Sequence, residues 1–560
     1  MTLAEYIATF LAEKGVRHVF GYQGGAILKL VDEMMATGRM EYIQNYHEQA
    51  SSFCADAYGR ITGHLGVAVA TSGPGATNLV TGIANAQMDS VPTLFLTGQD
   101  FSSHVKGRAE NVRLNGFQDL DIVSIAKPIT KYAAAIMDET TIRFELEKAY
   151  HLATTGRPGA VLLDIPIDLQ FKEIDPSTQK AYIPETPDVP PSPKLEELVQ
   201  LIQHAKRPVV LAGGGIHLSR TEEALQSFIA STHIPVVTTL NGVDAFAGSY
   251  SFSGLHGNTF ANLAVQNADI LIVLGARLGQ QQVGKNKQVY TSAKVVHVDV
   301  DNAELGRALD ENLSIHTDLP TFFNAFSKAS QGITFPDFSG WHAHIRIWEE
   351  KYTSTTHLNT HGLDPVRALT FILRQLEDDA VIASDVGQNQ MWVSQAFRKK
   401  GTQRLMNSSG LGSMGYSLPA AIGASYARPG AQVVSFAGDG GFQMNLQELM
   451  LLSQKRLPVK CVILNNNTLG MMRTSQKKYF EERYYGARVE DYASANIKGL
   501  AEAYGLPYLR IESETQLEQL IPVLKDDQPC LIELALPYHS LLSNRYDETA
   551  IFDSERIHDK

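Results

Sequence analysis

Two apolar segments of strand length, separated by a helix pattern, are the feature that most constrains the fold of this chain. AQVVSFA at 431–437 leads into the glycine turn at 438–440, and VKCVILN at 459–465 ends on the first of three asparagines. Residues 446–456 between them carry leucines and methionine at helical spacing. A strand, helix and strand in this order predict two parallel neighbours. Both turns should therefore lie at the same sheet edge, where open α/β sheets bind ligands.

Asp439, in the first turn, and Asn466, in the second, are therefore expected to lie close together. Oxygen ligands of this kind suit a hard cation such as Mg²⁺, which keeps phosphate oxygens and water in its shell. The glycines let backbone amides approach an anion, and the start of the next helix adds partial positive charge. The combination predicts a magnesium–diphosphate clamp, whereas Gly-Asp-Gly alone is also explained by a plain turn.

Length and composition limit the class of protein. A chain of 560 residues is too long for one core, which suggests about three domains. A formal net charge of -12 argues against nucleic acid or an anionic membrane as the main partner. No apolar run approaches the ~20 residues of a membrane helix. The amino terminus resembles an amphipathic helix containing Glu5 and Glu13 and not a signal peptide. Three separated cysteines are expected to be buried thiols, so we expect a cytoplasmic enzyme or binding protein.

Strand-like and helix-like segments alternate in three successive blocks, which predicts an α/β protein with three doubly wound, mostly parallel sheets. We expect domains at 1–172, 190–335 and 363–545. A proline-rich stretch at 182–197 predicts a stiff extended linker. A polar stretch with Trp and His at 338–362 is interpreted as a second connector.

Further patterns each allow a structural and a functional interpretation. Glu48 stands where a strand meets a helix, so it either complements the helix dipole or shares a proton with a heterocyclic nitrogen. TSGPG at 71–75 is a tight turn or a close backbone approach to a ligand. Met414 follows a Gly/Ser-rich segment and would ordinarily fill a core gap. GGG at 213–215 and GAR at 275–277 are more typical of turns after strands than of a dinucleotide motif.

Taken together, these motifs resemble one superfamily, the thiamine-diphosphate-dependent decarboxylases and carboligases. FGYQGGAILKLVDEM, YHEQ, TSGPGATNLVTGIANAQMDSVPTLFLTGQ, GFQDLDIV, DVGQNQMW, GLGSMGYSLPAAIG and GDGGFQMNLQEL followed by NNN stand in the family's order. Within the superfamily the chain looks most like the large subunit of acetolactate synthase. The resemblance implies a pyrimidine-binding first domain, a central domain that commonly holds FAD in a non-redox role, and a diphosphate-binding last domain.

The resemblance implies a role for each matched position. Glu48 would pair with the aminopyrimidine ring of the cofactor, which activates the thiazolium carbon toward pyruvate. Gly25 and Ala26 would lie beside the reacting carbon, and Phe117 and Gln118 would border the acceptor pocket. The cofactor would be held by Gln388, Gly412, Met414, Gly438, Gly440 and Gly441, and Mg²⁺ by Asp439, Asn466 and the carbonyl of Thr468. The positions matching the flavin-holding synthases are Gly214, Thr239, Leu240, His256, Gly275, Arg277, Asp299 and Asp301. In that family each active site lies between two subunits, so a homodimer or homotetramer is expected.

Three departures from the family pattern bear on the acceptor substrate. Gln23 replaces a proline, and Gln281 stands where an arginine helps hold the second keto acid. An amide replaces a bidentate guanidinium–carboxylate pair poorly. Ser475 stands where biosynthetic enzymes usually carry a tryptophan. The acceptor is therefore either a second pyruvate or a bulkier carbonyl compound, such as a nucleotide-linked keto-sugar in branched-sugar synthesis.

Two other functions compete with these. A non-catalytic paralogue would bind the cofactor without turnover, but Glu48, Asp439 and Asn466 are all present. A simple 2-keto acid decarboxylase would usually show paired histidines near the reacting carbon, which YHEQ lacks. Carbon dioxide release from pyruvate distinguishes the paralogue from the enzymes.

Overall fold

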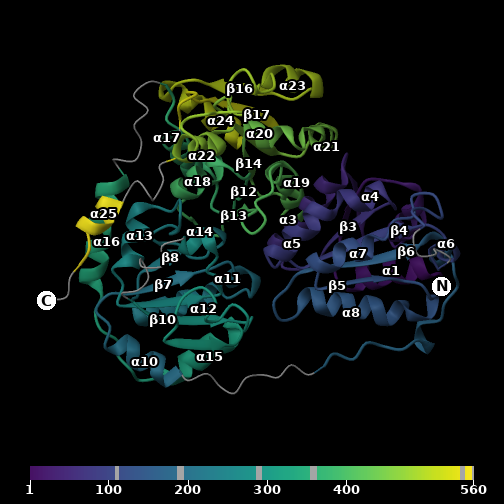
Figure 1. Ribbon diagram of the computed structural model, residues 1–560, viewed down its shortest axis with the longest axis horizontal. Helices are drawn as coiled ribbons and strands as arrows, with labels where there is room; N and C mark the ends of the chain where they lie inside the picture. The colour runs from purple at the N-terminus through teal and green to yellow at the C-terminus, as the bar shows by residue number, and fades with distance from the viewer. Residues whose placement is uncertain are drawn as a thin grey trace.

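The computed structural model describes residues 1–106, 112–185, 195–284, 293–353, 362–540, 542 and 549–557. It contains three parallel sheets covered by helices, one in each of the three lobes in Figure 1. The predicted α/β class with three doubly wound parallel sheets is confirmed. Each sheet lies inside one of the three predicted domain ranges, whose boundaries stay predictions. In the described residues, no helix is both long enough and apolar enough to cross a membrane.

The N-terminal sheet has the strand order β2-β1-β3-β4-β6-β5. Its strands are β1 (His18–Gly21), β2 (Glu41–Gln44), β3 (Gly66–Ala70), β4 (Thr93–Gln99), β5 (Tyr132–Ala135) and β6 (Ala160–Pro166). Its helices are α1 (Leu3–Glu13), α2 (Leu28–Ala36), α3 (Glu48–Thr62), α4 (Pro74–Asn78), α5 (Val80–Met88), α6 (Ser102–Lys106), α7 (Ile122–Ala126), α8 (Ile142–Thr154) and α9 (Ile167–Gln170). The expected N-terminal helix is α1, which starts at a capping box of Thr2 and Glu5.

The central sheet has five strands in the order β11-β10-β9-β7-β8. They are β7 (Pro208–Ala212), β8 (Val236–Thr238), β9 (Ile270–Leu274), β10 (Lys294–Asp299) and β11 (Leu313–His316). The helices are α10 (Leu195–Gln203), α11 (Gly215–Leu218), α12 (Glu222–Thr232), α13 (Thr259–Gln266), α14 (Gln280–Val283), α15 (Leu319–Ala329) and α16 (Ser339–Thr353). Of the proline-rich linker, 186–194 lies outside the described residues.

The expected connector at 338–362 is wrong in one respect, because most of its described part is the helix α16. Trp341, Ile345 and Trp348 recur at helical spacing and are buried in the core of the central domain. The last helix, α25 (Thr549–Ser554), lies beside α16 in Figure 1. The carboxylate of Glu555 accepts a hydrogen bond from the Trp348 indole at 2.9 Å. The end of the chain therefore returns to the central domain.

The C-terminal sheet has the strand order β13-β12-β14-β15-β17-β16, which repeats the order of the N-terminal sheet. Its strands are β12 (Val381–Ser384), β13 (Arg404–Asn407), β14 (Val433–Gly438), β15 (Val459–Asn465), β16 (Tyr508–Ile511) and β17 (Cys530–Ala535). Its helices are α17 (Pro365–Gln375), α18 (Gln388–Ala396), α19 (Ser417–Ala427), α20 (Asp439–Gln443), α21 (Leu449–Lys455), α22 (Gly470–Tyr479), α23 (Ile497–Tyr504) and α24 (Leu520–Lys525). The predicted parallel pairing of the two apolar segments is the pair β14–β15.

Helices α3 and α19 pack against each other and join the N-terminal and C-terminal domains. A Cβ at Gly423 of α19 would lie 2.2 Å from the carbonyl oxygen of Cys54 on α3, so only glycine permits this approach. Buried side chains of both domains form one hydrophobic cluster around this contact. Cys54, Cys461 and Cys530 are free and buried, as expected.

Candidate active site

Glu48 is the first residue of α3, at the edge of the sheet where β2 ends. Its side chain is buried, with 6% of the residue exposed, and one carboxylate oxygen accepts a hydrogen bond from Asn78 Nδ2 at 2.9 Å. The preceding His47 caps the helix by accepting from the backbone amide of Gln49. A carboxyl placed here is largely shielded from water and available to a ligand group at the sheet edge.

A glycine turn lies directly against Glu48. A Cβ at Gly75 would lie 3.1 Å from Glu48 Oε1 and 2.8 Å from Thr71 Cγ2. The Thr71 hydroxyl accepts a hydrogen bond from the backbone amide of Ala26 at 3.2 Å. Ala26 and Gly25 belong to a 3-10 turn at 25–27, and a Cβ added at Gly25 would have no atom within 4 Å. The structure thus brings the predicted Glu48, Gly25 and Ala26 segments together around the TSGPG turn.

Gln118 borders the same turn, and Phe117 beside it is exposed. The backbone of Gln118 has a φ of +59°, and a Cβ at Gly73 would lie 2.9 Å from Gln118 Cβ. Phe117 is 81% exposed, which is unusual for so large an apolar side chain. Part of this loop, 107–111, lies outside the described residues. The position of both residues agrees with the predicted pocket border, and their role stays a prediction.

The predicted metal ligands lie at adjacent strand ends of the C-terminal sheet. Asp439 follows β14 directly, and Asn466 follows β15. Both side chains are buried, and Tyr492 donates its hydroxyl to Asp439 Oδ2 at 2.9 Å. Burial raises the pKa of Asp439 to about 6, and the Tyr492 hydrogen bond opposes this rise. The carbonyl of Thr468 accepts from the amide of Gly470 at 3.0 Å, and a carbonyl oxygen has a second lone pair for a cation.

The glycines around Asp439 pack closely against side chains of neighbouring segments. A Cβ at Gly440 would lie 2.7 Å from Leu469 Cδ2 and 3.5 Å from Met414 Cε, so the tip of Met414 reaches this turn. Gln388 begins α18, and its side chain lies so close to Gly470 that a Cβ there would be 1.9 Å from Gln388 Oε1. Of the other predicted contacts, Gly441 packs on Asp385, Gly438 faces Asn389, and Gly412 has a φ of +73° beside Val386.

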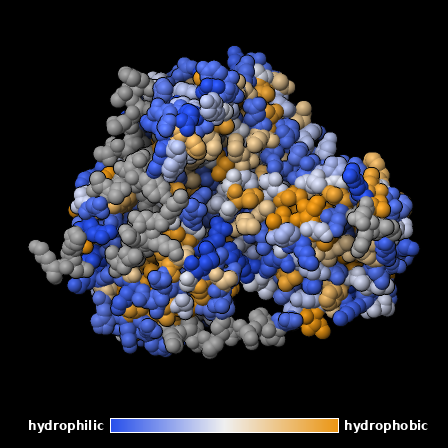
Figure 2. Space-filling view, viewed as in Figure 1, coloured by the Kyte–Doolittle hydropathy of each residue, from blue (hydrophilic) through white to orange (hydrophobic). Residues whose placement is uncertain are grey.

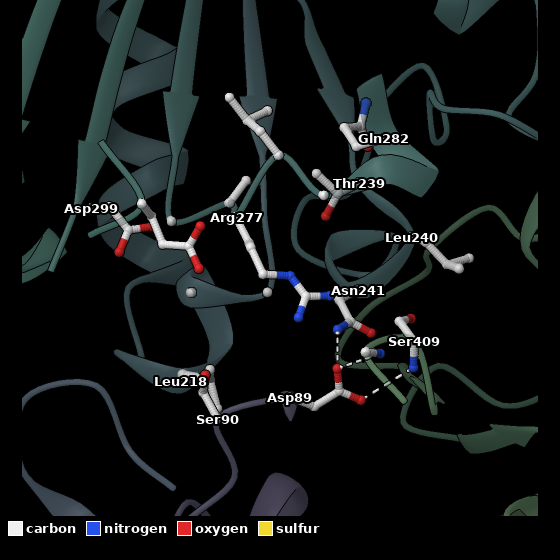
Figure 3. Close-up of a pocket in the computed structure, with 18 of the residues that line it drawn as sticks. Asp89, Ser90, Leu218, Thr239, Leu240, Asn241, Arg277, Gln282, Asp299 and Ser409 are labelled. Carbon is white, nitrogen blue, oxygen red and sulfur yellow. Dashed lines mark hydrogen bonds between the residues drawn. The ribbon is translucent and has the colours of Figure 1, made fainter. Parts of the chain in front are cut away.

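A cavity of about 650 Å³ lies where the central domain meets the other two, and Figure 3 shows residues that line it. All but one of the predicted flavin positions line it: Gly214, Thr239, Leu240, His256, Gly275, Arg277 and Asp299. Burial raises the pKa of the Asp299 carboxyl, although the Asp301 amide donates to it at 2.9 Å. The N-terminal domain adds Asp89 and Arg157 to the lining, and the C-terminal domain adds Ser409 and Gly410.

Asp301 is the exception among the flavin positions. It is outside the cavity lining and pairs with the Arg157 guanidinium at 2.7 Å, which also binds Glu304 at 3.0 Å. Asp301 therefore touches the cavity wall through Arg157 and through its own amide on Asp299, and its flavin-binding role stays a prediction.

The three departures occupy different places. Gln23 is exposed at the edge of the N-terminal sheet. Gln281 lines the central cavity from α14, and its carbonyl accepts from Leu255 N at 2.7 Å. Ser475 lies on α22, where its hydroxyl donates to the Met471 carbonyl at 3.3 Å. The structure thus separates Gln281 from Ser475 by domain, and their joint effect on the acceptor stays a prediction.

Several residues of these sites were missed by the sequence reasoning. Asp385 is fully buried and accepts from the backbone amides of Gly415 and Ser417 at 3.0 Å, which fixes the loop carrying Gly412 and Met414. Asn78, Tyr492 and Arg157 each hold a predicted residue. Asn78 lies in the motif at 71–99 but was given no role there, and Tyr492 and Arg157 belong to no motif. Asp385 is the first residue of the motif DVGQNQMW, directly after β12, but the motif did not show that its carboxylate would be buried and would hold the loop.

Comparison with known proteins identifies the class. Three family models match the chain, all described as thiamine pyrophosphate enzyme. The N-terminal TPP binding domain matches residues 1–125, the central domain matches 195–326, and the C-terminal TPP binding domain matches 385–534. The three matches fall on the three sheets in their order along the chain, and each contains most of the strands of its sheet. The chain therefore belongs to the thiamine pyrophosphate enzyme family.

Within that family, the chain is similar to several acetolactate synthases. The large subunit from Lactococcus lactis is 37% identical over 541 residues, covering 95% of this chain and 92% of the relative. The large subunit from Porphyra purpurea is 36% identical, covering 93% and 90%. The chloroplastic enzyme of Arabidopsis thaliana is 34% identical, covering 96% and 81%. The chain is thus a thiamine-diphosphate-dependent transferase similar to acetolactate synthase, and the predicted family and enzyme class are confirmed.

Proposed function

We propose that the protein is a carboligase that decarboxylates pyruvate and transfers the two-carbon unit to a second pyruvate or another carbonyl acceptor. The observation that carries this proposal is the buried Glu48 carboxyl, held by Asn78 against the glycine turn at 71–75. When bound, thiamine diphosphate would supply a carbon nucleophile for the keto group of pyruvate and a cationic ring that accepts the electron pair left when carbon dioxide departs.

The N-terminal half of the site acts on the proton of the ligand's ring nitrogen and on the negative charge that develops on the substrate oxygen. Glu48 exchanges a proton with a ring nitrogen of the ligand, and burial strengthens this contact because water competes less. Asn78 keeps the carboxylate oriented. The exposed backbone at Gly25 leaves space for substrate, where amides stabilise negative charge on oxygen.

The C-terminal half binds the anionic end of the cofactor through Mg²⁺. Asp439, Asn466 and the Thr468 carbonyl would hold Mg²⁺ through three oxygens, and the ion would neutralise the charge of the diphosphate. The buried Asp439 carboxyl has a pKa raised to about 6 by burial, so a neighbouring cation would offset the cost of its charge.

The central cavity is proposed to hold FAD. About 650 Å³ lies within the range of sites for bulky cofactors. Gly275, with a φ of +58°, lets the chain turn tightly beside the cavity, and Arg277 places a guanidinium in its wall. A purified protein that absorbs as flavin, and an apo form that rebinds FAD, would agree with this assignment. Failure of apo protein to bind FAD would remove it.

A second copy of the chain is proposed to complete each active site. Phe117 on one half and Tyr479, Phe480 and Met472 on the other are between 50% and 81% exposed. Figure 2 shows apolar residues on the face where the N-terminal and C-terminal domains adjoin. Exposed apolar surface of this kind is typical of an interface.

Mixing two inactive variants tests this arrangement. If the site joins Glu48 of one chain to Asp439 of another, a dimer of one Glu48→Gln chain and one Asp439→Asn chain has one wholly native site. After unfolding and joint refolding, activity should return to about a quarter of wild type, since about half the dimers are mixed. Sites contained within one chain would give no recovery.

The identity of the acceptor substrate is open between pyruvate and a larger carbonyl compound. The small Ser475 and the uncharged Gln281 favour an acceptor larger than pyruvate, whereas similarity along the whole chain favours pyruvate. Products should be compared with pyruvate alone and with added carbonyl acceptors, including nucleotide-linked keto-sugars. Acetolactate from pyruvate alone supports the synthase, and product formed only with an added acceptor supports the relative.

Glu48→Gln tests the central claim. Carbon dioxide release from pyruvate should fall by roughly 10²–10⁴-fold. Glu41→Gln is the matched control, because Glu41 lies on neighbouring β2 with its side chain 50% exposed. Glu41→Gln should keep normal turnover. Near-normal turnover of Glu48→Gln would remove Glu48 from the reaction.

A further inference from the structure

Asp89, directly after α5, joins all three domains. Its carboxylate accepts hydrogen bonds from Arg60 Nη2 at 2.9 Å, from Asn241 Nδ2 of the central domain at 3.0 Å, and from two amides of the C-terminal domain. Those amides are Ser409 N at 3.2 Å and Gly410 N at 2.8 Å. Only 7% of Asp89 is exposed. A buried carboxylate with four donors occupies most of its lone-pair positions.

On one side, Asp89 fixes the start of the loop that carries the predicted cofactor contacts Gly412 and Met414. A Cβ at Gly410 would lie 2.8 Å from Asp89 Oδ1, so this approach requires glycine. The loop continues to Gly415, whose amide is held by Asp385 at 3.0 Å. The segment from 409 to 415 is therefore pinned at both ends by buried carboxylates.

On the other side, Asp89 belongs to the wall of the central cavity. Asn241, Asp89 and Ser409 lie together there, joined by the hydrogen bonds drawn in Figure 3. Arg277, across the cavity, donates to the carbonyl of Met88 at 3.3 Å. A ligand in the cavity therefore touches the group that fixes the loop.

We propose that Asp89 is a positioning residue that couples ligand binding in the central cavity to cofactor binding at the thiamine site. FAD in the cavity holds Asn241 and Asp89 in place, Asp89 holds the loop at 409–415, and the loop holds the cofactor. By thermodynamic linkage each ligand must then tighten the binding of the other by the same factor. This inference rests on the FAD and thiamine diphosphate assignments proposed above.

Binding titrations test the coupling without measuring activity. Apo protein is titrated with FAD, followed by flavin fluorescence, with and without saturating thiamine diphosphate and Mg²⁺. The reverse titration follows thiamine diphosphate by calorimetry with and without FAD. In wild type each ligand should lower the Kd of the other by about tenfold, within the usual range of such couplings.

Asp89→Asn should reduce this factor toward one, because its amide nitrogen faces donors that it cannot accept from. Asp269→Asn is the matched control, because Asp269 also accepts two backbone amides, of Lys206 and Arg207, but within the central domain. This control should keep the wild-type factor.

Asn241→Ala is a second test in case the Asp89→Asn protein is unstable. It removes one hydrogen-bond donor to Asp89 and keeps the other three. Its Kd for thiamine diphosphate without FAD should match wild type, while the effect of FAD on that Kd disappears. A general structural defect would weaken binding in both conditions equally.

The outcomes separate the two proposals. Wild-type protein that binds both ligands independently would overturn the coupling and leave the proposed function intact. Full coupling in Asp89→Asn would overturn the role of Asp89. Wild-type protein that fails to bind FAD would overturn both the FAD assignment and the coupling.

Discussion

The carboxyl of Glu448 should titrate near neutral pH and make the stability of the protein depend on it. Glu448 belongs to the C-terminal domain and is 0% exposed, and its side chain contacts the N-terminal domain. It accepts from Asn45 Nδ2 and from the Tyr46 amide, both at 2.9 Å, just ahead of Glu48 in the sequence. Burial raises the pKa of Glu448 from 4.5 to about 7, and these two hydrogen bonds oppose the rise.

The size and sign of the effect follow from that pKa. A rise from 4.5 to about 7 corresponds to about 3 kcal/mol. Because the pKa is higher in the folded state, the folded protein binds this proton more strongly. Its contribution to stability is fully present below pH 4.5 and is lost as the pH rises to about 7. Above that, the buried charge costs the whole amount.

Glu448→Gln should therefore stabilise the protein at pH 8 and have little effect near pH 5. The amide introduced by Glu448→Gln also fits this site. Asn45 Oδ1 has no hydrogen-bond partner, so after rotation of the Asn45 side-chain amide it can accept a hydrogen bond from the introduced NH₂ group. The difference in thermal midpoint between variant and wild type is measured from pH 5 to 8. Glu41→Gln, an exposed change on β2, serves as control and should show no such trend.

A second measurement observes the proton itself. In infrared difference spectra, wild type should lose a protonated-carboxyl band near pH 7 that Glu448→Gln lacks. A midpoint difference that is the same at pH 5 and pH 8, together with no band specific to Glu448, would refute the reasoning.

Three further predictions concern the metal site, the domain contact and the acceptor. Asp439→Asn should weaken Mg²⁺-dependent binding of thiamine diphosphate at least tenfold in calorimetry, and unchanged affinity would contradict the clamp. Gly423→Ala should destabilise the fold by about 1–3 kcal/mol in urea unfolding, because its Cβ would lie 2.2 Å from the Cys54 carbonyl. Gln281→Arg combined with Ser475→Trp should raise the share of product in which a keto acid was the acceptor. Unchanged product ratios would show that these two positions do not determine which acceptor is used.

The parts of the fold predicted from sequence are those fixed by local patterns. Strand, glycine turn and helix could be recognised around Glu48, at 71–75 and at Asp439 because each spans a few consecutive residues. The parallel topology then placed Asp439 and Asn466 at one edge without further information. Motif order supplied the family and most of the candidate site.

The missed features depend on contacts between distant residues. Asp89 and Glu448 gain their meaning only from partners in other domains, as in the contact of Glu448 with Asn45. An acid in a sequence does not show whether folding will bury it. The helix α16 was hidden for a different reason, because its polar average masks a helical stripe of Trp341, Ile345 and Trp348.

The N-terminal and C-terminal sheets share one strand order, so one framework occurs twice with different turns on it. After its third strand the first sheet carries the neutral TSGPG, whereas the other carries Gly438-Asp439-Gly440. The two turns thus differ by one acidic side chain, and under the proposed function the first would lie beside the uncharged ring of the cofactor and the second beside its metal-bound diphosphate. The shared strand order would then fix where the two ends of the elongated cofactor bind, and each turn would set the chemistry at its own end.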